Sequence, residues 1–228
     1  MTTMSQVKQV VQPLLERNPD LALVGRLVVV KPVHHILRGI YIDRCSNPLL
    51  FIPNYAVIFL FEPRHSFTFN WGQEVYRTSP GSGLFDISDP DTAMDMCEGI
   101  EKQALPRLRP VQSLDDFVTF TSKENFSYTY LDLYEIRKIY VDVARGDLNS
   151  ARAICAFLAT EHGRRKNLPM MHEEYNLIMD RLCPLLAAND KPGLARFLQE
   201  CEAKSVRNLK LEKLWEATPF PLEALPDA

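Results

Sequence analysis

Hydrophobic residues follow a helical period at the start of the chain and a strand period directly after it. The first helical face carries Val7, Val10, Val11, Leu14 and Leu15. Beyond Pro19 the apolar residues run nearly continuously or alternate with polar ones, as they do in β-strands. The expected strands span residues 22–31, 36–43, 49–52, 55–62 and 67–71, with a break at Pro53. Because the connections are too short for crossover helices, the sequence predicts a mostly antiparallel meander.

The later strand segments are rich in aromatic residues. Segment 55–62, YAVIFLFE, has apolar side chains on both faces, which predicts an interior strand. In contrast, Phe67, Phe69 and Trp71 alternate with polar residues, which is typical of a half-exposed strand. Core packing is one interpretation of these three aromatics. The other is an exposed face or groove wall, because aromatic residues are favoured in partner interfaces and ligand pockets.

Helical periodicity returns in the middle of the chain. Asp89-Pro90 is suited to begin a helix, and Pro106 is expected to end it. Ser113 and Asp116 have the spacing of a capping box at the start of the next helix. The polar segment 121–126 that follows is the expected domain boundary.

Beyond that boundary the pattern is entirely helical. The expected helices span residues 130–144, 148–158, 175–188 and 206–215, and a further helix runs from the turn at 189–192 to about residue 203. Gly146-Asp147 and Asn189-Asp190 each join two amphipathic helices, 43 residues apart. The echo has two interpretations, a repeat of the kind that stacks into solenoids or two ordinary helical hairpins. Two copies are fewer than a solenoid usually needs.

Taken together, the patterns predict an α+β fold. We expect a mostly antiparallel sheet with flanking helices over residues 1–122, followed by an all-helical region of helical hairpins over residues 126–228.

Composition and charge exclude several classes of protein. The chain of 228 residues is 46% hydrophobic and 24% charged, with a net charge of −3. Basic and acidic residues number 12 and 14 up to Asn125, and 14 and 15 after it, so no basic half exists to bind nucleic acid or an anionic membrane. The longest apolar run, Ala56 to Phe61, is too short to cross a bilayer. Since the N-terminus also lacks a signal-peptide pattern, we expect a cytoplasmic protein.

Cysteine and histidine spacing indicates neither a metal nor a disulfide framework. The five cysteines are Cys45, Cys97, Cys155, Cys183 and Cys201. They are scattered with no CxxC spacing, so we expect them to be small buried residues, with a stability independent of reductant or chelator. Adjacent His34 and His35 would point to opposite faces of a strand. His172-Glu173-Glu174 lacks the second histidine of a zinc motif.

Catalytic and cofactor motifs are missing as well. The serines Ser79, Ser82 and Ser88 lie in or beside a Gly-Pro loop and outside any nucleophile motif. Gly81-Ser82-Gly83 lacks the strand and helix that a phosphate-binding loop requires. We therefore expect no metal and no cofactor, and no catalytic residue is singled out.

Two charged segments are candidate binding sites. The acidic one contains Asp86, Asp89, Asp91, Asp95, Glu98 and Glu101. It could bind a cation or a basic partner, but acids near a helix N-terminus also complement the helix dipole. The basic run 162–167, HGRRKN, is expected to be an exposed loop that could touch phosphate or an acidic partner.

The sequence favours a non-enzymatic binding or regulatory protein that acts through protein contacts. This hypothesis rests on the missing catalytic motifs and on the helical hairpins, which commonly supply interaction surfaces. The alternative is an enzyme or small-ligand binder with a pocket between sheet and helices, built from scattered residues.

Overall fold

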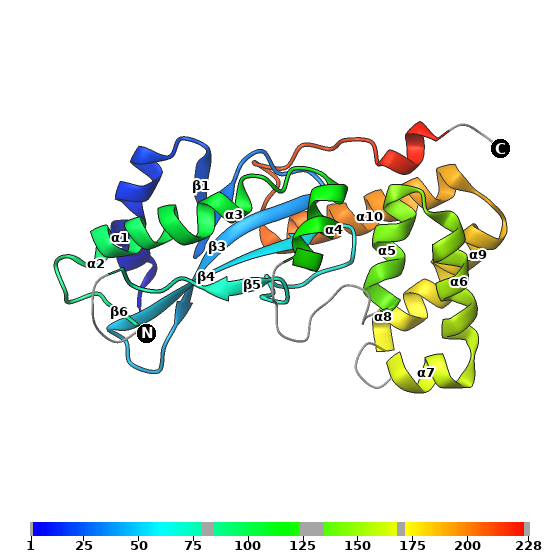
Figure 1. The fold of residues 1–228 in the computed structure, drawn as a ribbon, viewed down its shortest axis with the longest axis horizontal. Coiled ribbons are helices and arrows are strands. Elements are labelled where there is room, and N and C mark those ends of the chain that lie inside the picture. Colours follow the sequence, from blue (N-terminus) through cyan, green and yellow to red (C-terminus); the bar gives the residue numbers. More distant parts are fainter. Residues whose placement is uncertain (1, 79–83, 124–134, 168–171, 226–228) are drawn as a thin grey trace. The chain divides into compact units, whose positions relative to one another are not determined.

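The computed structural model describes residues 2–78, 84–123, 135–167 and 172–225, and it confirms the α+β fold. Six strands form one sheet (Figure 1). They are β1 (Leu21–Val24), β2 (Leu27–Val30), β3 (Ile36–Arg44), β4 (Leu50–Phe59), β5 (Gly72–Glu74) and β6 (Phe85–Asp86). Their order is β1-β2-β3-β4-β5, and β6 also pairs with β4. The β1–β2, β2–β3, β4–β5 and β4–β6 pairings are antiparallel, as the short connections predicted.

The predicted first strand, 22–31, is wrong as a single element. It is a hairpin of β1 and β2, in which Val24 pairs with Leu27 across a two-residue turn. Gly25 opens the turn with a φ of 60°. Glycine adopts this left-handed conformation without steric cost, so the apolar run can reverse direction where its pattern shows no interruption.

Strand β4 confirms the predicted interior segment and corrects the break before it. All residues from Tyr55 to Phe61 are fully buried, although the strand itself ends at Phe59. Pro53 lies within β4. It falls between Phe51, which pairs with β6, and Asn54, which pairs with β5. Pro53 O still accepts the Val75 N–H over 2.8 Å, so the missing proline N–H removes only one donor, just beyond the paired residues of β5.

The predicted strand 67–71 is also wrong, because regular pairing begins only at Gly72. A Cβ atom at Gly72 would lie 2.2 Å from the Tyr55 carbonyl oxygen, so glycine permits the close approach of β5 to β4. The preceding aromatics pack against other rings. Trp71 is buried with its ring 5.1 Å from that of Phe117, in an edge-to-face contact.

The helices around the sheet are α1 (Met4–Arg17), α2 (Thr92–Gly99), the π-helical segment η1 (Ile100–Ala104), α3 (Leu105–Leu108) and α4 (Leu114–Lys123). The prediction that Pro106 ends a helix is wrong, since α2, η1 and α3 form one rod (Figure 1). The Leu105 N–H donates to Ile100 O across a widened π turn directly before the proline. The predicted capping box is confirmed: Ser113 N–H donates to Asp116 Oδ2 over 2.9 Å, and Asp116 N–H donates to Ser113 Oγ over 3.1 Å.

The remaining helices are α5 (Glu135–Arg145), α6 (Leu148–Ala159), α7 (Glu161–Asn167), α8 (His172–Leu177), the π segment η3 (Ile178–Leu182), α9 (Cys183–Ala187), α10 (Lys191–Leu209) and the 3-10 turn η4 (Pro221–Ala224). Both predicted turns occur, with Asp147 capping α6 and Asp190 accepting from Gly193 N–H. The separate helix 206–215 is wrong, because α10 continues to Leu209 and ends where Lys210 takes a φ of 60°.

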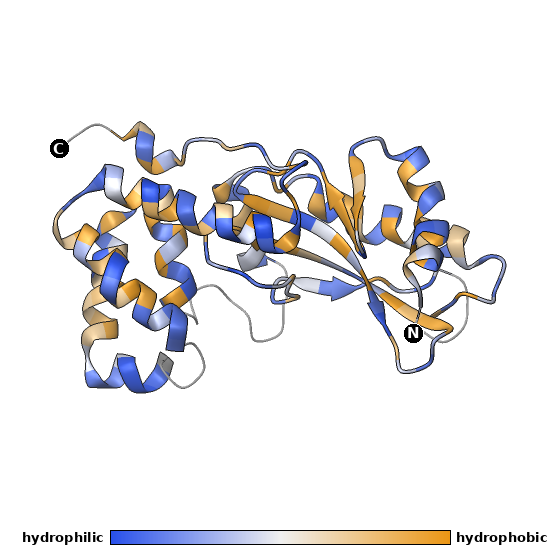
Figure 2. Ribbon diagram, turned by 180° about the vertical axis from the view of Figure 1, so that it is seen from behind, coloured by the Kyte–Doolittle hydropathy of each residue, from blue (hydrophilic) through white to orange (hydrophobic). Residues whose placement is uncertain are grey.

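The basic run is not a loop but helix α7. Thr160 Oγ1 accepts from Gly163 N–H at its start, and Glu161 pairs with Arg165 one turn later. Figure 2 shows the hydrophilic character of α7 against the hydrophobic strands of the sheet. A cap and an i,i+4 ion pair let a polar segment form a helix without an apolar face of its own.

Contacts among the helices close a ring. Helix α5 contacts α6, α6 contacts η3 and α9, α9 contacts α10, and α10 contacts α5. A solenoid would instead align equivalent helices, α5 with α9 and α6 with α10, and these pairs are not among the main helix contacts of the described residues. The arrangement favours two ordinary hairpins that pack against each other.

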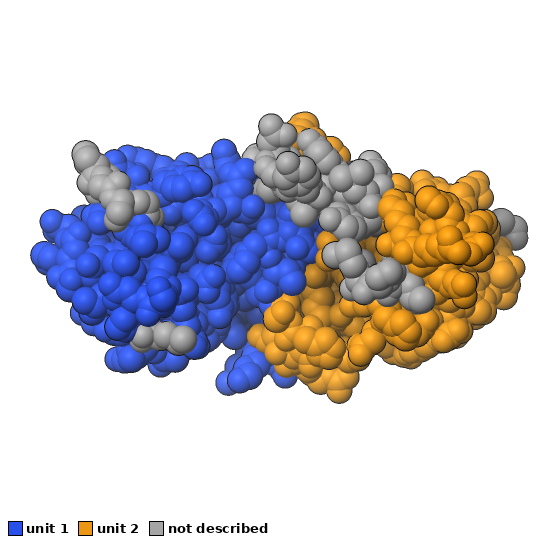
Figure 3. Space-filling view, turned by 90° about the horizontal axis from the view of Figure 1, so that it is seen from below, with its two compact units in different colours: residues 1–58, 67–120, 210–216 blue, residues 59–66, 121–209, 217–228 orange. Residues whose placement is uncertain are grey.

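The chain divides into two compact units, which Figure 3 distinguishes by colour. Unit 1 comprises 1–58, 67–120 and 210–216, and unit 2 comprises 59–66, 121–209 and 217–228. The predicted division into 1–122 and 126–228 stays a prediction. Each unit takes up segments from distant parts of the sequence.

The expectation for the cysteines is wrong for two of them. Cys155 and Cys183 form a disulfide, with their Cα atoms 5.9 Å apart. Their separation of 28 residues carries no spacing signal, but the packing of α6 against α9 brings them within bonding reach. Cys97 and Cys201 are free and buried, and Cys45 is free and half-buried.

Candidate functional site

Three aromatic side chains meet at the surface of unit 1. Tyr41 lies on β3, and Phe67 and Phe69 lie on the segment before β5. The Tyr41 ring is 6.2 Å from Phe67 and 5.9 Å from Phe69, and the two phenylalanine rings are 5.6 Å apart. We call these three residues the aromatic cluster.

The aromatic cluster is not part of the core. Phe69 is 38% exposed, whereas Tyr41 and Phe67 are half-buried. Trp71, predicted to share their face, is fully buried. The two interpretations of the aromatic segment therefore apply to different residues: core packing holds for Trp71 and exposure for Phe69. Sequence reasoning missed Tyr41, which no local pattern connects to residues 67 and 69.

A carboxylate lies beside the aromatic cluster. Asp43 follows Tyr41 by two residues on β3, so both side chains point to the same face of the strand. The Asp43 side chain is half-buried, and its Oδ1 accepts the Arg44 backbone N–H over 2.7 Å. A carboxylate has further lone pairs, so Asp43 can still accept other hydrogen bonds. The three rings and this acid form a surface that can contact cationic and apolar groups, and Arg26 lies within electrostatic range of both Tyr41 and Asp43.

The acidic segment lines a groove of about 970 Å³ in unit 1, but its charges are largely engaged within the protein. Arg77 donates to Asp95 over 2.7 Å and to Asp89 over 3.0 Å, and these hydrogen bonds raise the pKa of Arg77. The outer acids are paired too, Glu98 with Lys102 and Glu101 with Arg17.

Two other members of the acidic segment behave differently. Asp86 accepts from the Ser88 hydroxyl over 2.6 Å, which lowers the pKa of its carboxyl group. Asp91 shows no ion pair in the described part of the chain. The segment mainly anchors the loop at Arg77 to α2, and we interpret it as structural.

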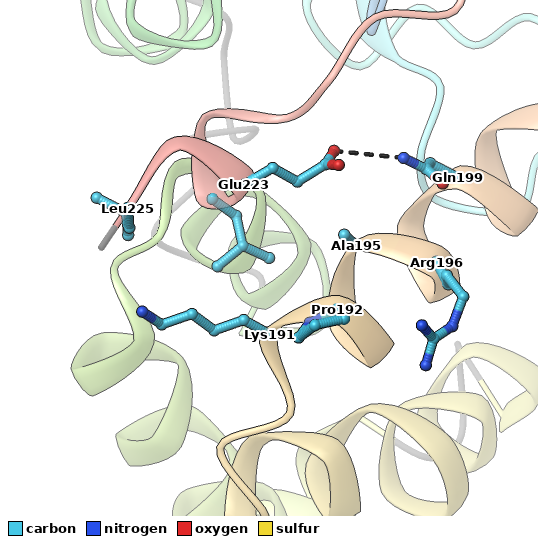
Figure 4. Close-up of a pocket in the computed structure, with 8 residues that line it drawn as sticks. Lys191, Pro192, Ala195, Arg196, Gln199, Glu223 and Leu225 are labelled. Atoms are coloured by element: carbon cyan, nitrogen blue, oxygen red, sulfur yellow. Dashed lines mark hydrogen bonds between the residues drawn. The ribbon is translucent and has the colours of Figure 1, made fainter. Parts of the chain in front are cut away.

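A pocket of about 360 Å³ in unit 2 lies between α10 and η4 (Figure 4). Its polar groups do not converge on one point: Figure 4 shows Lys191 and Arg196 pointing in different directions. Glu223 Oε1 accepts from the Phe220 backbone N–H over 2.7 Å and from Gln199 Nε2 over 3.3 Å, so this carboxylate holds η4 in place. Small-ligand sites usually aim a few polar groups at one point. This pocket does not strengthen the small-ligand alternative.

Unit 2 also contains a buried ion pair, between Glu62 and Arg64. Arg64 Nε donates to Phe59 O over 3.0 Å, and its backbone N–H donates to Ser205 Oγ over 2.9 Å. Burial lowers the pKa of Arg64, although Glu62 opposes this. Because Arg64 donates to a backbone carbonyl and to Ser205 on α10, the ion pair fixes segment 59–66 within unit 2. Nearby, the buried Tyr140 hydroxyl has no hydrogen-bond partner among the described residues.

The other sequence candidates are dispersed. His34 Nδ1 lies 3.2 Å from Glu216 O, His35 is buried, and His172 contacts Asn176. Residues 79–83, with two serines and the Gly81 loop, lie outside the described residues. Within the described ranges, no group of three His, Cys, Asp or Glu side chains is arranged to hold a metal ion. No helix there is long and apolar enough to cross a membrane.

Comparison with protein-family models, with curated proteins and with solved structures found no match to this chain. The functional argument therefore depends on the surface chemistry of the structure itself.

Proposed function

We propose that this protein is a non-enzymatic, cytoplasmic binding protein whose aromatic cluster docks a segment of another protein. The observation that carries the proposal is the contact of Tyr41, Phe67 and Phe69 at a surface where Phe69 is 38% exposed. Aromatic residues dominate the energetics of protein interfaces because they bury large areas with few rotatable bonds.

The chemistry of the aromatic cluster indicates its occupant. Ring faces attract the cationic groups of arginine and lysine, and Asp43 adds a negative charge on the same face of β3. Apolar side chains would gain from burying the rings. The occupant is therefore a partner segment in which an arginine or lysine lies beside an apolar residue.

Peptide selection tests this assignment. Random displayed peptides would be selected on the full chain, and the peptides retained would be assayed singly by fluorescence anisotropy. We expect them to combine a basic and an apolar residue. Phe69→Ser should weaken their binding by about 30-fold, the equivalent of about 2 kcal/mol for a central interface residue.

A matched control separates the aromatic cluster from mere exposed aromatic surface. Tyr76 is 57% exposed and belongs to the same unit, so Tyr76→Ser should leave binding unchanged. Equal loss in both variants, or selected peptides without basic residues, would contradict the assignment. Circular dichroism of each variant checks that the fold is retained.

A further inference from the structure

The disulfide of unit 2 joins two helices at a partly accessible position. Cys155 lies on α6 and Cys183 is the first residue of α9, and both are half-buried. A disulfide exchanges by attack of a thiolate on one of its sulfur atoms, so access for a small thiol is the first requirement. Both cysteine residues are partly exposed, in contrast to the fully buried Cys97, so a small thiol can approach this region.

The two helices are also held together without the disulfide. The Tyr175 hydroxyl of α8 donates to Leu158 O of α6 over 2.7 Å in the interior. Arg152 of α6 donates to Leu186 O and, over 2.8 Å, to Asn189 Oδ1. These bonds connect the two hairpins on either side of the cysteines. Opening the disulfide therefore leaves the thiols close enough to bond again.

Cys183 occupies an irregular point of its helix. Its backbone N–H donates to Ile178 O and closes the π segment η3, directly before Pro184. Such π turns occur frequently at functional sites. The Met179 sulfur lies 4.0 Å from Cys183 Sγ, so one further soft, polarisable atom lies beside the disulfide.

From these observations we propose that Cys155–Cys183 is a reversible redox-modification site that exchanges with a small thiol such as glutathione. Two thiol molecules transfer two electrons and two protons to the disulfide. The protein gains two cysteine thiols, and the small thiol leaves as its own disulfide. A size of 228 residues supports this assignment, because a chain this long needs no covalent staple to fold.

The site would control the segment between the cysteines. This span contains the basic helix α7, in which Lys166 pairs with Glu135 outside the span and contacts Phe157 within it. When the disulfide opens, α7 and α8 lose the covalent link that limits their movement. The reduced state should loosen α7, whereas the hydrogen bond from Tyr175 to Leu158 O keeps α8 beside α6 in both states.

Equilibration with glutathione tests the proposal. The intact protein would be incubated in buffers of graded reduced-to-oxidised glutathione ratio, quenched with acid, and alkylated under denaturing conditions to count thiols by mass. We expect the oxidised fraction to change smoothly with the ratio and to reach the same value from either starting state. The intramolecular bond is identified by the loss of two thiols without an added glutathione mass; Cys155→Ser should abolish this signal, whereas Cys45→Ser should retain it.

Hydrogen exchange supplies the structural readout. In the reduced protein, amides of α7 should lose protection, while those of β2 and β3 keep theirs. A disulfide that stays closed in the most reducing buffer until the protein unfolds would overturn the proposal and identify a purely structural bond. Reduced protein that fails to form the bond again in oxidised glutathione would overturn it equally.

Discussion

Removal of the Cys155–Cys183 disulfide gives a stability change that can be calculated from the fold. The perturbation is the double substitution Cys155→Ser, Cys183→Ser. The bond closes a separation of 28 residues. Cross-linking a loop of that length lowers the entropy of the unfolded chain by roughly 12 cal/mol/K, or about 3.6 kcal/mol at 25 °C. Since both side chains are half-buried, their lost burial adds little, and unit 2 should be destabilised by about 3.6 kcal/mol.

Two spectroscopic probes make the assay specific. Trp71 and Trp215 both belong to unit 1, so tryptophan fluorescence reports that unit, whereas the far-UV signal also reports the helices of unit 2. In guanidinium chloride, the far-UV transition of the double variant should move to lower denaturant and the fluorescence transition should stay in place. For a unit of 109 residues, with an unfolding entropy of about 2.1 cal/mol/K per residue, the equivalent shift in Tm is roughly 16 °C.

Dithiothreitol provides the control. It should shift the wild-type transition by the same amount and leave the double variant unaffected. A wild-type far-UV transition that is insensitive to dithiothreitol, although mass analysis shows reduced cysteines, would refute the loop-entropy reasoning. It would also restore the sequence-based expectation that stability does not depend on reductant.

Three further substitutions test the packing. Phe59→Ala should cost about 3–5 kcal/mol in urea unfolding, because it empties a fully buried site under the Arg64 guanidinium group, and a cost below 1 kcal/mol would contradict the interior position of β4. Tyr140→Phe should raise the free energy of unfolding by about 1 kcal/mol by removing an unpartnered buried hydroxyl. Burial raises the Tyr140 pKa, so the wild type should lose stability relative to this variant above about pH 10, where the unfolded side chain ionises. Ser113→Ala should cost about 1 kcal/mol through the lost cap of α4, and an unchanged urea midpoint would show that the cap contributes nothing.

Features fixed by neighbouring residues could be predicted from the sequence. The capping box of Ser113 and Asp116 is one, since both hydrogen bonds form within a single helical turn. The interior position of β4 is another, because apolar side chains on both faces of a strand must be covered. In each case the energetic reason is contained in a few consecutive residues.

The error at Pro106 shows where local rules fail, and Pro184 lies in the same geometry within a helix that the sequence predicts to continue. Pro106 and Pro184 each follow a five-residue π segment, and in both cases the residue just before the proline donates across the widened turn. The backbone adjusts before the proline and the helix continues. Isoleucine begins both π segments, and a proline is the second residue after each. This shared pattern has no known meaning in the sequence alone, so it could be recognised only from the structure.

The candidate site could not be predicted from the sequence, because the exposure of a strand residue depends on which distant segments pack over it. Along one face of β3, Leu37 and Gly39 are buried, Tyr41 is half-buried, and Asp43 is half-buried next to the end of the strand. The alternating pattern assigns all four residues to the same face, but it does not show which of them other segments bury. Phe67 and Phe69 return to that position only after the chain has contributed residues 59–66 to unit 2. The aromatic cluster therefore forms where neighbouring residues no longer cover the strand, and its exposure and close ring packing are the basis of the docking role that we propose.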